Sequence, residues 1–193
     1  MDKKEGYIMN KKIIICALST LVVGCATMDD STLVVDDAGY THHTMSMASD
    51  ARGSWDFPAK RPATGRKVFV FDPKVHAWAA YDSDGNLVKT GSASGGSDYC
   101  SDIGRSCRTT VGIYHIYSKK GSECKSSIYP VETGGGAKMP YCMHFNGGYS
   151  IHAAYEVPRY NSSHGCIRVL PSAARWLNED FLSVGSTVIV ESY

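Results

Sequence analysis

The chain lacks a dominant charge, an internal repeat and any apolar run long enough to stay in a membrane as a spanning helix. Its 20 lysine and arginine residues are nearly balanced by 19 aspartate and glutamate residues, which gives a formal net charge of +1. This balance disfavours a basic face for nucleic acid binding. With 43% hydrophobic and only 20% charged residues, the 193-residue chain has the composition of one packed globular domain with short appendages.

Residues 1–24 have the pattern of a secretory signal of the lipoprotein type. A short positive segment at 9–12 precedes an eleven-residue apolar run at 13–23, which a glycine and Cys25 follow. A bilayer span needs about 20 apolar residues, so we expect this segment to be removed, and the residues before Met9 fit a signal poorly, which favours Met9 as the true start. The sequence around Cys25 resembles a bacterial lipobox, whose cysteine is lipid-modified and becomes the new N-terminus. The alternative is cleavage nearby, with Cys25 an ordinary thiol.

The rest of the chain divides into a polar segment and a domain. Residues 25–65 are mostly polar and irregular, which is typical of a flexible tether between a lipid and a domain. From Arg66 the pattern changes to short β-type runs, so we expect the folded domain at 66–193. With a lipid on Cys25, this domain would lie in the cell envelope, at the periplasmic face of a bacterial membrane.

The domain is expected to be mainly β. Strand-like runs separated by turn signals lie at 67–71, 75–81, 87–90, 112–117, 141–145, 149–152 and 187–191. One short helix is expected near the C-terminus at 173–181, with Ser172 as its N-cap. The order of these elements has no βαβ alternation, so we expect an antiparallel β-sandwich or open barrel with this single helix.

Residues that can carry chemistry concentrate near the end of the chain. Ser-His-Gly-Cys-Ile-Arg at 163–168, with His152 fourteen residues before the cysteine, resembles the signature of the L,D-transpeptidases, the YkuD-like catalytic domain of bacterial cell-wall enzymes. The strand entry at 110–114 and the Met-Pro-Tyr at 139–141 also fit this family. The resemblance covers most of 66–193 and implies the family's fold.

Cys166 is the candidate nucleophile and His152 its candidate base. A free thiol has a pKa of about 8.5, so it needs a base or positive surroundings to react at neutral pH. Gly165 permits a tight backbone that would direct the amides of Gly165 and Cys166 toward a developing oxyanion. The resemblance implies that the residue after the histidine, here Ala153, orients the imidazole through its backbone carbonyl.

Three further residues are assigned to oxyanion or substrate binding. Arg168 shares the face of the cysteine if that segment is extended, and the resemblance implies that it holds the site or a substrate carboxylate; a buried ion pair that supports the loop is an equal alternative. His164 is a packing residue, a donor to the tetrahedral intermediate or a part of the acceptor site. Ser163 is expected to fix the loop by hydrogen bonding rather than to react. His144 is expected to line the core or the pocket.

Four other cysteines, Cys100, Cys107, Cys124 and Cys142, allow three pairings. An exported compartment is oxidising enough for disulfides, and catalysis requires that none of the four captures Cys166. We favour Cys100 with Cys107 and Cys124 with Cys142 over the crossed pairings. Four reduced and buried thiols are the alternative.

The resemblance implies an acyl-transfer enzyme that needs no cofactor. Cys166 would attack the carbonyl of the third residue, meso-diaminopimelate, of a peptidoglycan tetrapeptide stem, releasing D-alanine and forming a thioester. A second stem peptide as acceptor gives a 3→3 cross-link, a wall lipoprotein gives a protein anchor, and water makes the enzyme an L,D-carboxypeptidase.

Two other classes of function compete with this interpretation. One is a catalytically idle lipoprotein that binds the wall or another surface through the same fold. The other is a zinc site made by His144, His152, His164 and Cys166, but this reading leaves the Ser-His-Gly-Cys spacing unexplained. We therefore expect no metal in the site.

Overall fold

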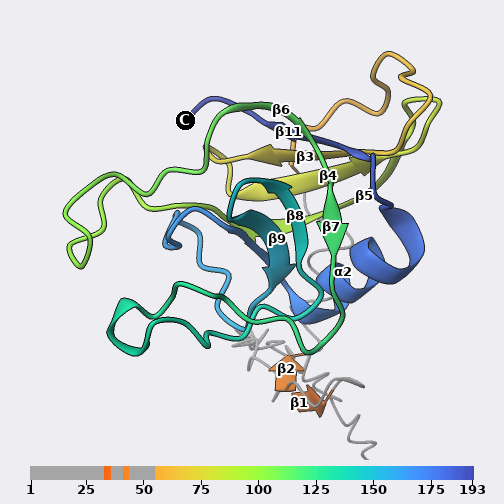
Figure 1. Ribbon diagram of the computed structural model, residues 1–193. Helices are drawn as coiled ribbons and strands as arrows, with labels where there is room; N and C mark the ends of the chain where they lie inside the picture. The colour runs from red at the N-terminus through yellow and green to blue at the C-terminus, as the bar shows by residue number, and fades with distance from the viewer. Residues whose placement is uncertain (1–32, 36–40, 44–54) are drawn as a thin grey trace, which may run out of the picture. The chain divides into compact units, whose positions relative to one another are not determined.

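The computed structural model describes residues 33–35, 41–43 and 55–193 (Figure 1). The expected signal peptide, the lipidation site Cys25 and most of the expected tether lie outside the described residues. Leu33–Val35 (β1) and Thr41–His43 (β2) pair as a two-stranded antiparallel sheet, which is regular structure in a segment expected to be irregular. In the described part of the chain, no helix has the length and apolar character needed to cross a membrane.

A sheet of nine strands forms the domain. Their spatial order is β6 (Gly112–His115), β11 (Thr187–Val190), β3 (Val68–Asp72), β4 (Ala77–Tyr81), β5 (Leu87–Ser94), β10 (Ile167–Val169), β9 (Tyr149–Ala153), β8 (Met143–Asn146) and β7 (Ser118–Lys119). Most neighbours are antiparallel, but β11 runs parallel to β3 and β10 runs parallel to β9. The domain is mainly β, as expected, and its sheet is mixed rather than purely antiparallel.

The sheet curls because consecutive strands lie at its two ends. β6 pairs with β11 and β7 pairs with β8, and only two residues separate β6 from β7 along the chain. In this connection Ile116 N–H donates to the Ser186 carbonyl and Tyr117 N–H donates to the His144 carbonyl. The chain thus joins both ends of the sheet, which gives the expected open barrel (Figure 1).

The predicted helix is present with a different beginning. α2 spans Pro171–Trp176 and continues as a π-helical turn, η2, over Leu177–Phe181. Its N-cap is Leu170, not Ser172 as expected from the sequence. Proline is favoured in the first helical position because its fixed φ suits the helix and its missing N–H would have no partner there. The helix therefore begins two residues earlier than a serine cap would place it.

The core lies on both faces of β3. Phe69 and Phe71 pack with Trp78 of β4 and with the C-terminal helical segment, whereas Val68 and Val70 pack in a second cluster that includes Tyr81. A strand buried on both faces reads as a continuous apolar run, which is how this segment appears in the sequence.

Residues before Arg66 also contact the domain. Phe57 packs against the second cluster, and the Tyr81 hydroxyl donates to the Pro58 carbonyl at 3.0 Å. A bridge pairs Lys60 with Asn86. These contacts hold residues 57–60 on the sheet rather than leaving them as free tether.

Candidate active site

A pocket of about 680 Å³ opens beside β8, β9 and β10. This volume suits a small-molecule or peptide ligand. Its lining brings together six of the seven catalytic, orienting and binding residues expected from the sequence, namely His152, Ala153, Ser163, His164, Cys166 and Arg168. Gly165 is the one that does not line it. His144 also lines the pocket, as expected. Burial lowers the pKa of its imidazole, and the charge of Lys120 lowers it further.

The parallel pairing of β9 with β10 brings together the segments of the candidate nucleophile, Cys166, and the candidate base, His152. Its register sets Ile167 opposite Ile151 and Arg168 opposite His152. Cys166 immediately precedes β10, so the sulfur lies at the point where this pairing begins. Two segments separated by a long loop thus meet side by side, which sequence order alone does not reveal.

Cys166 is a free and half-buried thiol. Its Sγ accepts a hydrogen bond from Ser150 Oγ at 3.6 Å and donates to the Gly148 carbonyl at 3.8 Å. Burial raises the pKa of the Cys166 thiol, while hydrogen bonds from Ser150 and the charge of Arg168 act in the opposite direction. At neutral pH the group is therefore a thiol, which needs a base before it can attack a carbonyl.

His152 has the properties of that base. The side chain is buried, and Nδ1 lies 2.8 Å from the backbone oxygen of Ala153. A carbonyl only accepts hydrogen bonds, so the proton of the neutral ring is on Nδ1, and Nε2 is left as the proton acceptor. This is the orienting contact that the resemblance implied for Ala153.

Burial also keeps His152 neutral. It lowers the pKa of His152 to about 4; the charges of Arg168 and His144 act in the same direction, and the Ala153 hydrogen bond acts against them. In the described residues no hydrogen bond joins the imidazole directly to the Cys166 sulfur. The resting site therefore holds an uncharged thiol and an uncharged base that line one pocket.

Ser163 fixes the loop before Cys166. Its Oγ donates to the Cys166 carbonyl at 2.5 Å and accepts from the Gly165 N–H at 3.0 Å. This is the loop-fixing role expected for the serine. The Gly165 amide is consequently engaged inside the loop, and our expectation that it points at an oxyanion is corrected.

Gly165 is required at its position for a steric reason. Its φ is +118°, and a Cβ added there would lie 2.0 Å from Cε1 of the Tyr149 ring. No side chain can be accommodated without moving Tyr149 or the loop. The glycine of the motif thus lets the chain pass close to β9 on its way to Cys166.

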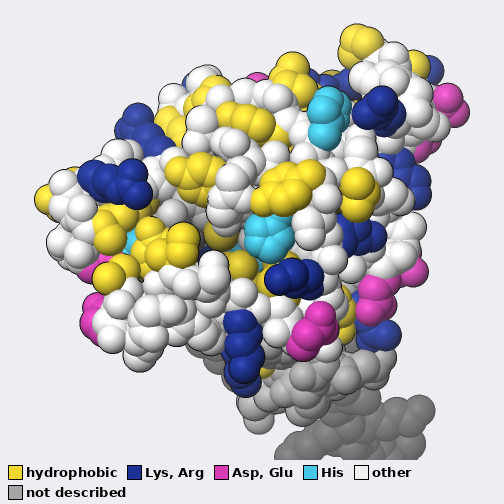
Figure 2. Space-filling model, viewed as in Figure 1, with side chains coloured by type: hydrophobic (Ala, Val, Ile, Leu, Met, Phe, Trp, Pro, Cys, Tyr) yellow, Lys and Arg dark blue, Asp and Glu magenta, His cyan; other side chains and the backbone are white. Residues whose placement is uncertain are grey.

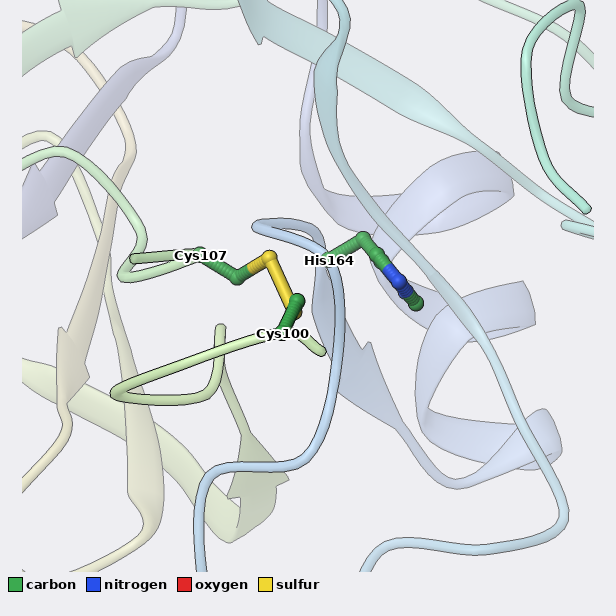
Figure 3. Close-up of side chains that lie close together, drawn as sticks. All are labelled: Cys100, Cys107 and His164. Atoms are coloured by element: carbon green, nitrogen blue, oxygen red, sulfur yellow. A yellow bond between two sulfur atoms is a disulfide. The ribbon is translucent and has the colours of Figure 1, made fainter. Parts of the chain in front are cut away.

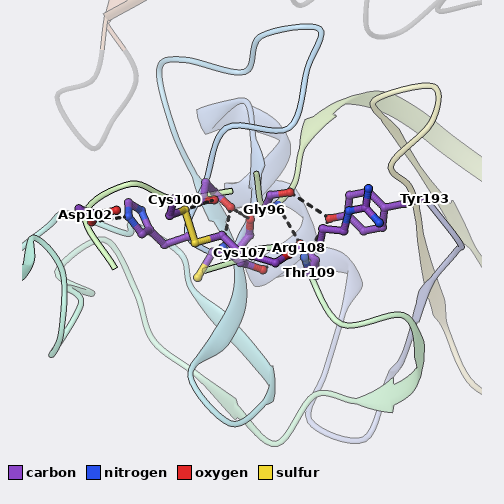
Figure 4. Close-up of a disulfide and its surroundings, with 12 residues drawn as sticks. Gly96, Cys100, Asp102, Cys107, Arg108, Thr109 and Tyr193 are labelled. Carbon is purple, nitrogen blue, oxygen red and sulfur yellow. Dashed lines mark hydrogen bonds and ion pairs between the residues drawn. A yellow bond between two sulfur atoms is a disulfide. The ribbon is translucent and has the colours of Figure 1, made fainter. Parts of the chain in front are cut away.

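His164 is held by a carboxylate and an aromatic ring. Nε2 lies 2.7 Å from Asp102 Oδ2, and the ring packs on Tyr129 with 4.4 Å between the ring centroids. Asp102 belongs to the loop that the Cys100–Cys107 disulfide closes, as Figure 4 shows. Neither Asp102 nor Tyr129 was singled out from the sequence, because each lies more than thirty residues from the motif.

Both disulfides have the pairing favoured from the sequence. Cys100 is bonded to Cys107 with 5.9 Å between their Cα atoms, and Cys124 is bonded to Cys142 with 6.1 Å. The first closes the loop that carries Asp102, and the second closes the long loop that carries Tyr129. His164 therefore contacts one residue from each disulfide-closed loop.

Thr109 connects the first disulfide loop to the motif. Its Oγ1 donates to the Gly165 carbonyl at 2.9 Å and accepts from the Gly96 N–H at 3.0 Å. Its own N–H donates to the Tyr193 hydroxyl at 2.8 Å (Figure 4). This buried threonine thereby ties the motif loop to the C-terminus of the chain. The sequence offered no signal for it.

Arg168 lines the pocket without a carboxylate partner among the described residues. Its Nη1 donates to Ser162 Oγ at 3.4 Å. The alternative of a buried ion pair is therefore not found in the described part of the chain. The guanidinium remains available for an anionic group in the pocket.

The zinc set considered from the sequence is not assembled. Among the described residues, three possible ligand atoms gather within 4.8 Å only at Cys100, Cys107 and His164 (Figure 3). The two sulfurs of that group are bonded to each other, and zinc requires thiolates. The cluster is a histidine packed beside a disulfide.

The comparisons with known proteins agree with this geometry. The model of the L,D-transpeptidase catalytic domain, YkuD, matches residues 66–190. No curated protein matches the chain. An L,D-transpeptidase from Xylanimonas cellulosilytica DSM 15894 is 25% identical over 76% of this chain and 69% of that one, with a TM-score of 0.55.

Two further solved structures share the fold. An L,D-transpeptidase from Stackebrandtia nassauensis is 24% identical over 77% of this chain and 66% of its own, with a TM-score of 0.56. L,D-transpeptidase 3 from Mycobacterium tuberculosis, in complex with a faropenem-derived adduct, is 22% identical over 66% of this chain and 60% of its own, with a TM-score of 0.51. The chain thus spans about two thirds of the length of these structures. The family model matches more than half of this chain, so the chain belongs to the L,D-transpeptidase catalytic domain family.

Proposed function

We propose that the chain is a peptidoglycan L,D-transpeptidase that works through a cysteine thioester. The observation that carries the proposal is the pairing, in one pocket, of the free thiol Cys166 with a buried neutral His152 whose Nε2 is unprotonated. Both groups are uncharged in the resting site, so the thiol can be activated by passing its proton to His152 Nε2 as it attacks.

In the first step Cys166 attacks the carbonyl of the third residue of a tetrapeptide stem. The thiol proton passes to Nε2 of His152, and the carbonyl carbon forms a bond to sulfur. The resulting imidazolium is buried, which disfavours its charge. It therefore returns the proton readily to the nitrogen of the leaving D-alanine. The tetrahedral intermediate collapses to a thioester, and His152 is neutral again.

In the second step an amine attacks the thioester and Cys166 leaves as the sulfur group. His152 accepts the amine proton and returns it to the sulfur. The free amine of another stem peptide gives a 3→3 cross-link, and the amine of a wall lipoprotein gives an anchored protein. Attack by water gives an L,D-carboxypeptidase.

The positive charge of the pocket lining supports an acyl-donor substrate that is anionic. The pocket lining contains the cations Arg105, Lys120, Lys125, Lys138 and Arg168, with Glu156 as the carboxylate of the set. On the face drawn in Figure 2, hydrophobic side chains gather near the centre and basic side chains lie around them. Stem peptides of this class carry free carboxylates, which such cations attract. We assign Arg168, whose guanidinium makes no ion pair with any described residue, to one of them.

The proposal includes a location. A lipid on Cys25 would hold the domain in the cell envelope, at the periplasmic face of a membrane, within reach of its polymer substrate. This part depends on the lipobox pattern in the sequence.

Purified protein with a disaccharide-tetrapeptide tests the function. The wild type should release D-alanine and yield a 3→3 dimer or a hydrolysed tripeptide, and the product identifies the acceptor. Cys166→Ala should release none. D-alanine release by Cys166→Ala equal to the wild type, or none by the wild type, would overturn the proposal.

A further inference from the structure

A buried serine beside the nucleophile has no role in the mechanism so far. Ser150 is fully buried near the start of β9, where an aliphatic or aromatic side chain is the usual choice. Within the described residues its hydroxyl makes one side-chain hydrogen bond, to Cys166 Sγ at 3.6 Å. A buried hydroxyl without a partner is costly, so the sulfur is the group that makes serine acceptable here.

The strand geometry explains this contact. Side chains alternate along a strand, so Ser150 and His152 lie on the same face of β9. The pairing of Ile151 with Ile167 places Cys166, one residue earlier, beside Ser150. β9 therefore carries the hydroxyl donor to the sulfur and the candidate base on the same face.

The two partners of the sulfur have opposite preferences. The Gly148 carbonyl, 3.8 Å away, can only accept a hydrogen bond and so favours the protonated thiol. The Ser150 hydroxyl donates to sulfur and so favours the thiolate. Hydrogen bonds to a charged atom are stronger than those to a neutral one, so the contact gains strength as the sulfur becomes negative.

We propose that Ser150 is a catalytic residue that stabilises negative charge on the Cys166 sulfur. Its O–H donates to sulfur as the thiol proton passes to His152 Nε2, and again as sulfur leaves the thioester. Ser150 keeps its own proton throughout, so no further acid or base is needed. The inference rests on the proposed function of Cys166 as the nucleophile.

Titration of Cys166 is the direct test. Its reaction with iodoacetamide is followed against pH by mass spectrometry of the Cys166 peptide, which separates it from all other cysteines. Ser150→Ala should move the thiol titration upward by about one pH unit and slow alkylation at pH 7 about tenfold. The turnover number should fall by a similar factor while KM stays nearly constant, because the contact gains most of its strength when the sulfur is charged.

The surroundings stay the same in this variant. The charged and titratable groups that line the same pocket include His144 on β8, His152 on β9, Arg168 on β10, and Lys120, Glu156 and His164 on loops. Ser150→Ala leaves each of them in place, so a change in titration reports the lost hydroxyl.

Two other variants complete the experiment. Ser186→Ala removes another buried serine hydroxyl, one that accepts from the Ser183 N–H, and should leave the titration of Cys166 unchanged. Ser150→Thr keeps the hydroxyl and should titrate like the wild type, which retains a test if the alanine variant does not fold.

Three results would overturn the inference. They are an unchanged titration of Cys166 in Ser150→Ala, an equal change in Ser186→Ala, and a threonine variant that titrates like alanine. A lower turnover number with an unchanged titration means that Ser150 acts through packing, which also contradicts it. If the titration moves as expected but the wild type never reacts with a stem peptide, the proposed function fails and the Ser150 contact stands.

Discussion

His152→Asn should make the folding stability of the domain less sensitive to acid. Burial lowers the pKa of His152 from its ordinary 6.5 to about 4 in the folded protein. Between these values the unfolded chain binds a proton that the folded chain excludes, so the free energy of unfolding falls as the pH falls through this window. The pKa difference of about 2.5, at 1.36 kcal/mol for each pKa unit, corresponds to about 3 kcal/mol in the free energy of unfolding.

Asparagine is the suitable replacement because its amide can still donate to the Ala153 carbonyl but does not titrate in this range. Urea unfolding at several pH values between 7 and 4.5, with both disulfides intact, gives the free energy of unfolding of each protein. Carboxylates and the remaining histidines titrate in both, so their contributions largely cancel in the difference. The wild type should lose stability faster than the variant, by up to about 1.4 kcal/mol per pH unit near pH 5. Parallel pH profiles would refute the argument that burial holds His152 neutral.

Three other predictions follow from the site and the sequence. The acid limb of kcat/KM for the wild type should lie well below pH 6.5, because the free enzyme keeps His152 neutral to about pH 4; a limb at 6.5 or above contradicts this. Gly165→Ala should cut the rate of acylation more than tenfold, measured by stopped-flow with a carbapenem, because its Cβ collides with Tyr149. In cells fed a labelled fatty acid, Cys25→Ser should lose the label and appear in the soluble fraction, whereas retained label would place the modification elsewhere.

The sheet was predictable where strands carry alternating or continuous apolar residues, whereas only the first half of β5, the longest strand, was expected. β3 and β4 were predicted to within two residues because they are buried and consist almost entirely of apolar residues. β7 and β10 have two and three residues, too few to show a period, and the parallel pairing of β10 with β9 is set only by the tertiary fold. The helix cap was misplaced because proline, one residue before the serine, begins the helix.

The site was predictable in its residue types and only partly in its contacts. The motif identified Cys166 and His152 as candidates. The other four cysteines of the domain can form two disulfides among themselves, which left Cys166 as the free thiol. The amide of Gly165 was misassigned because a serine two residues earlier captures it, a local side-chain to backbone bond that competes with any other use. Asp102, Thr109 and Ser150 were missed because their roles depend on contacts with segments distant in the chain.

Intact mass spectrometry of the purified protein after incubation with a carbapenem tests the central claim most directly. The wild type should gain the mass of one drug molecule, and peptide mapping should place it on Cys166. His152→Ala should acquire the adduct much more slowly, and Cys166→Ala should acquire none. A wild type that stays unmodified, or an adduct that persists in Cys166→Ala, would contradict the account of Cys166 as the acyl-accepting nucleophile.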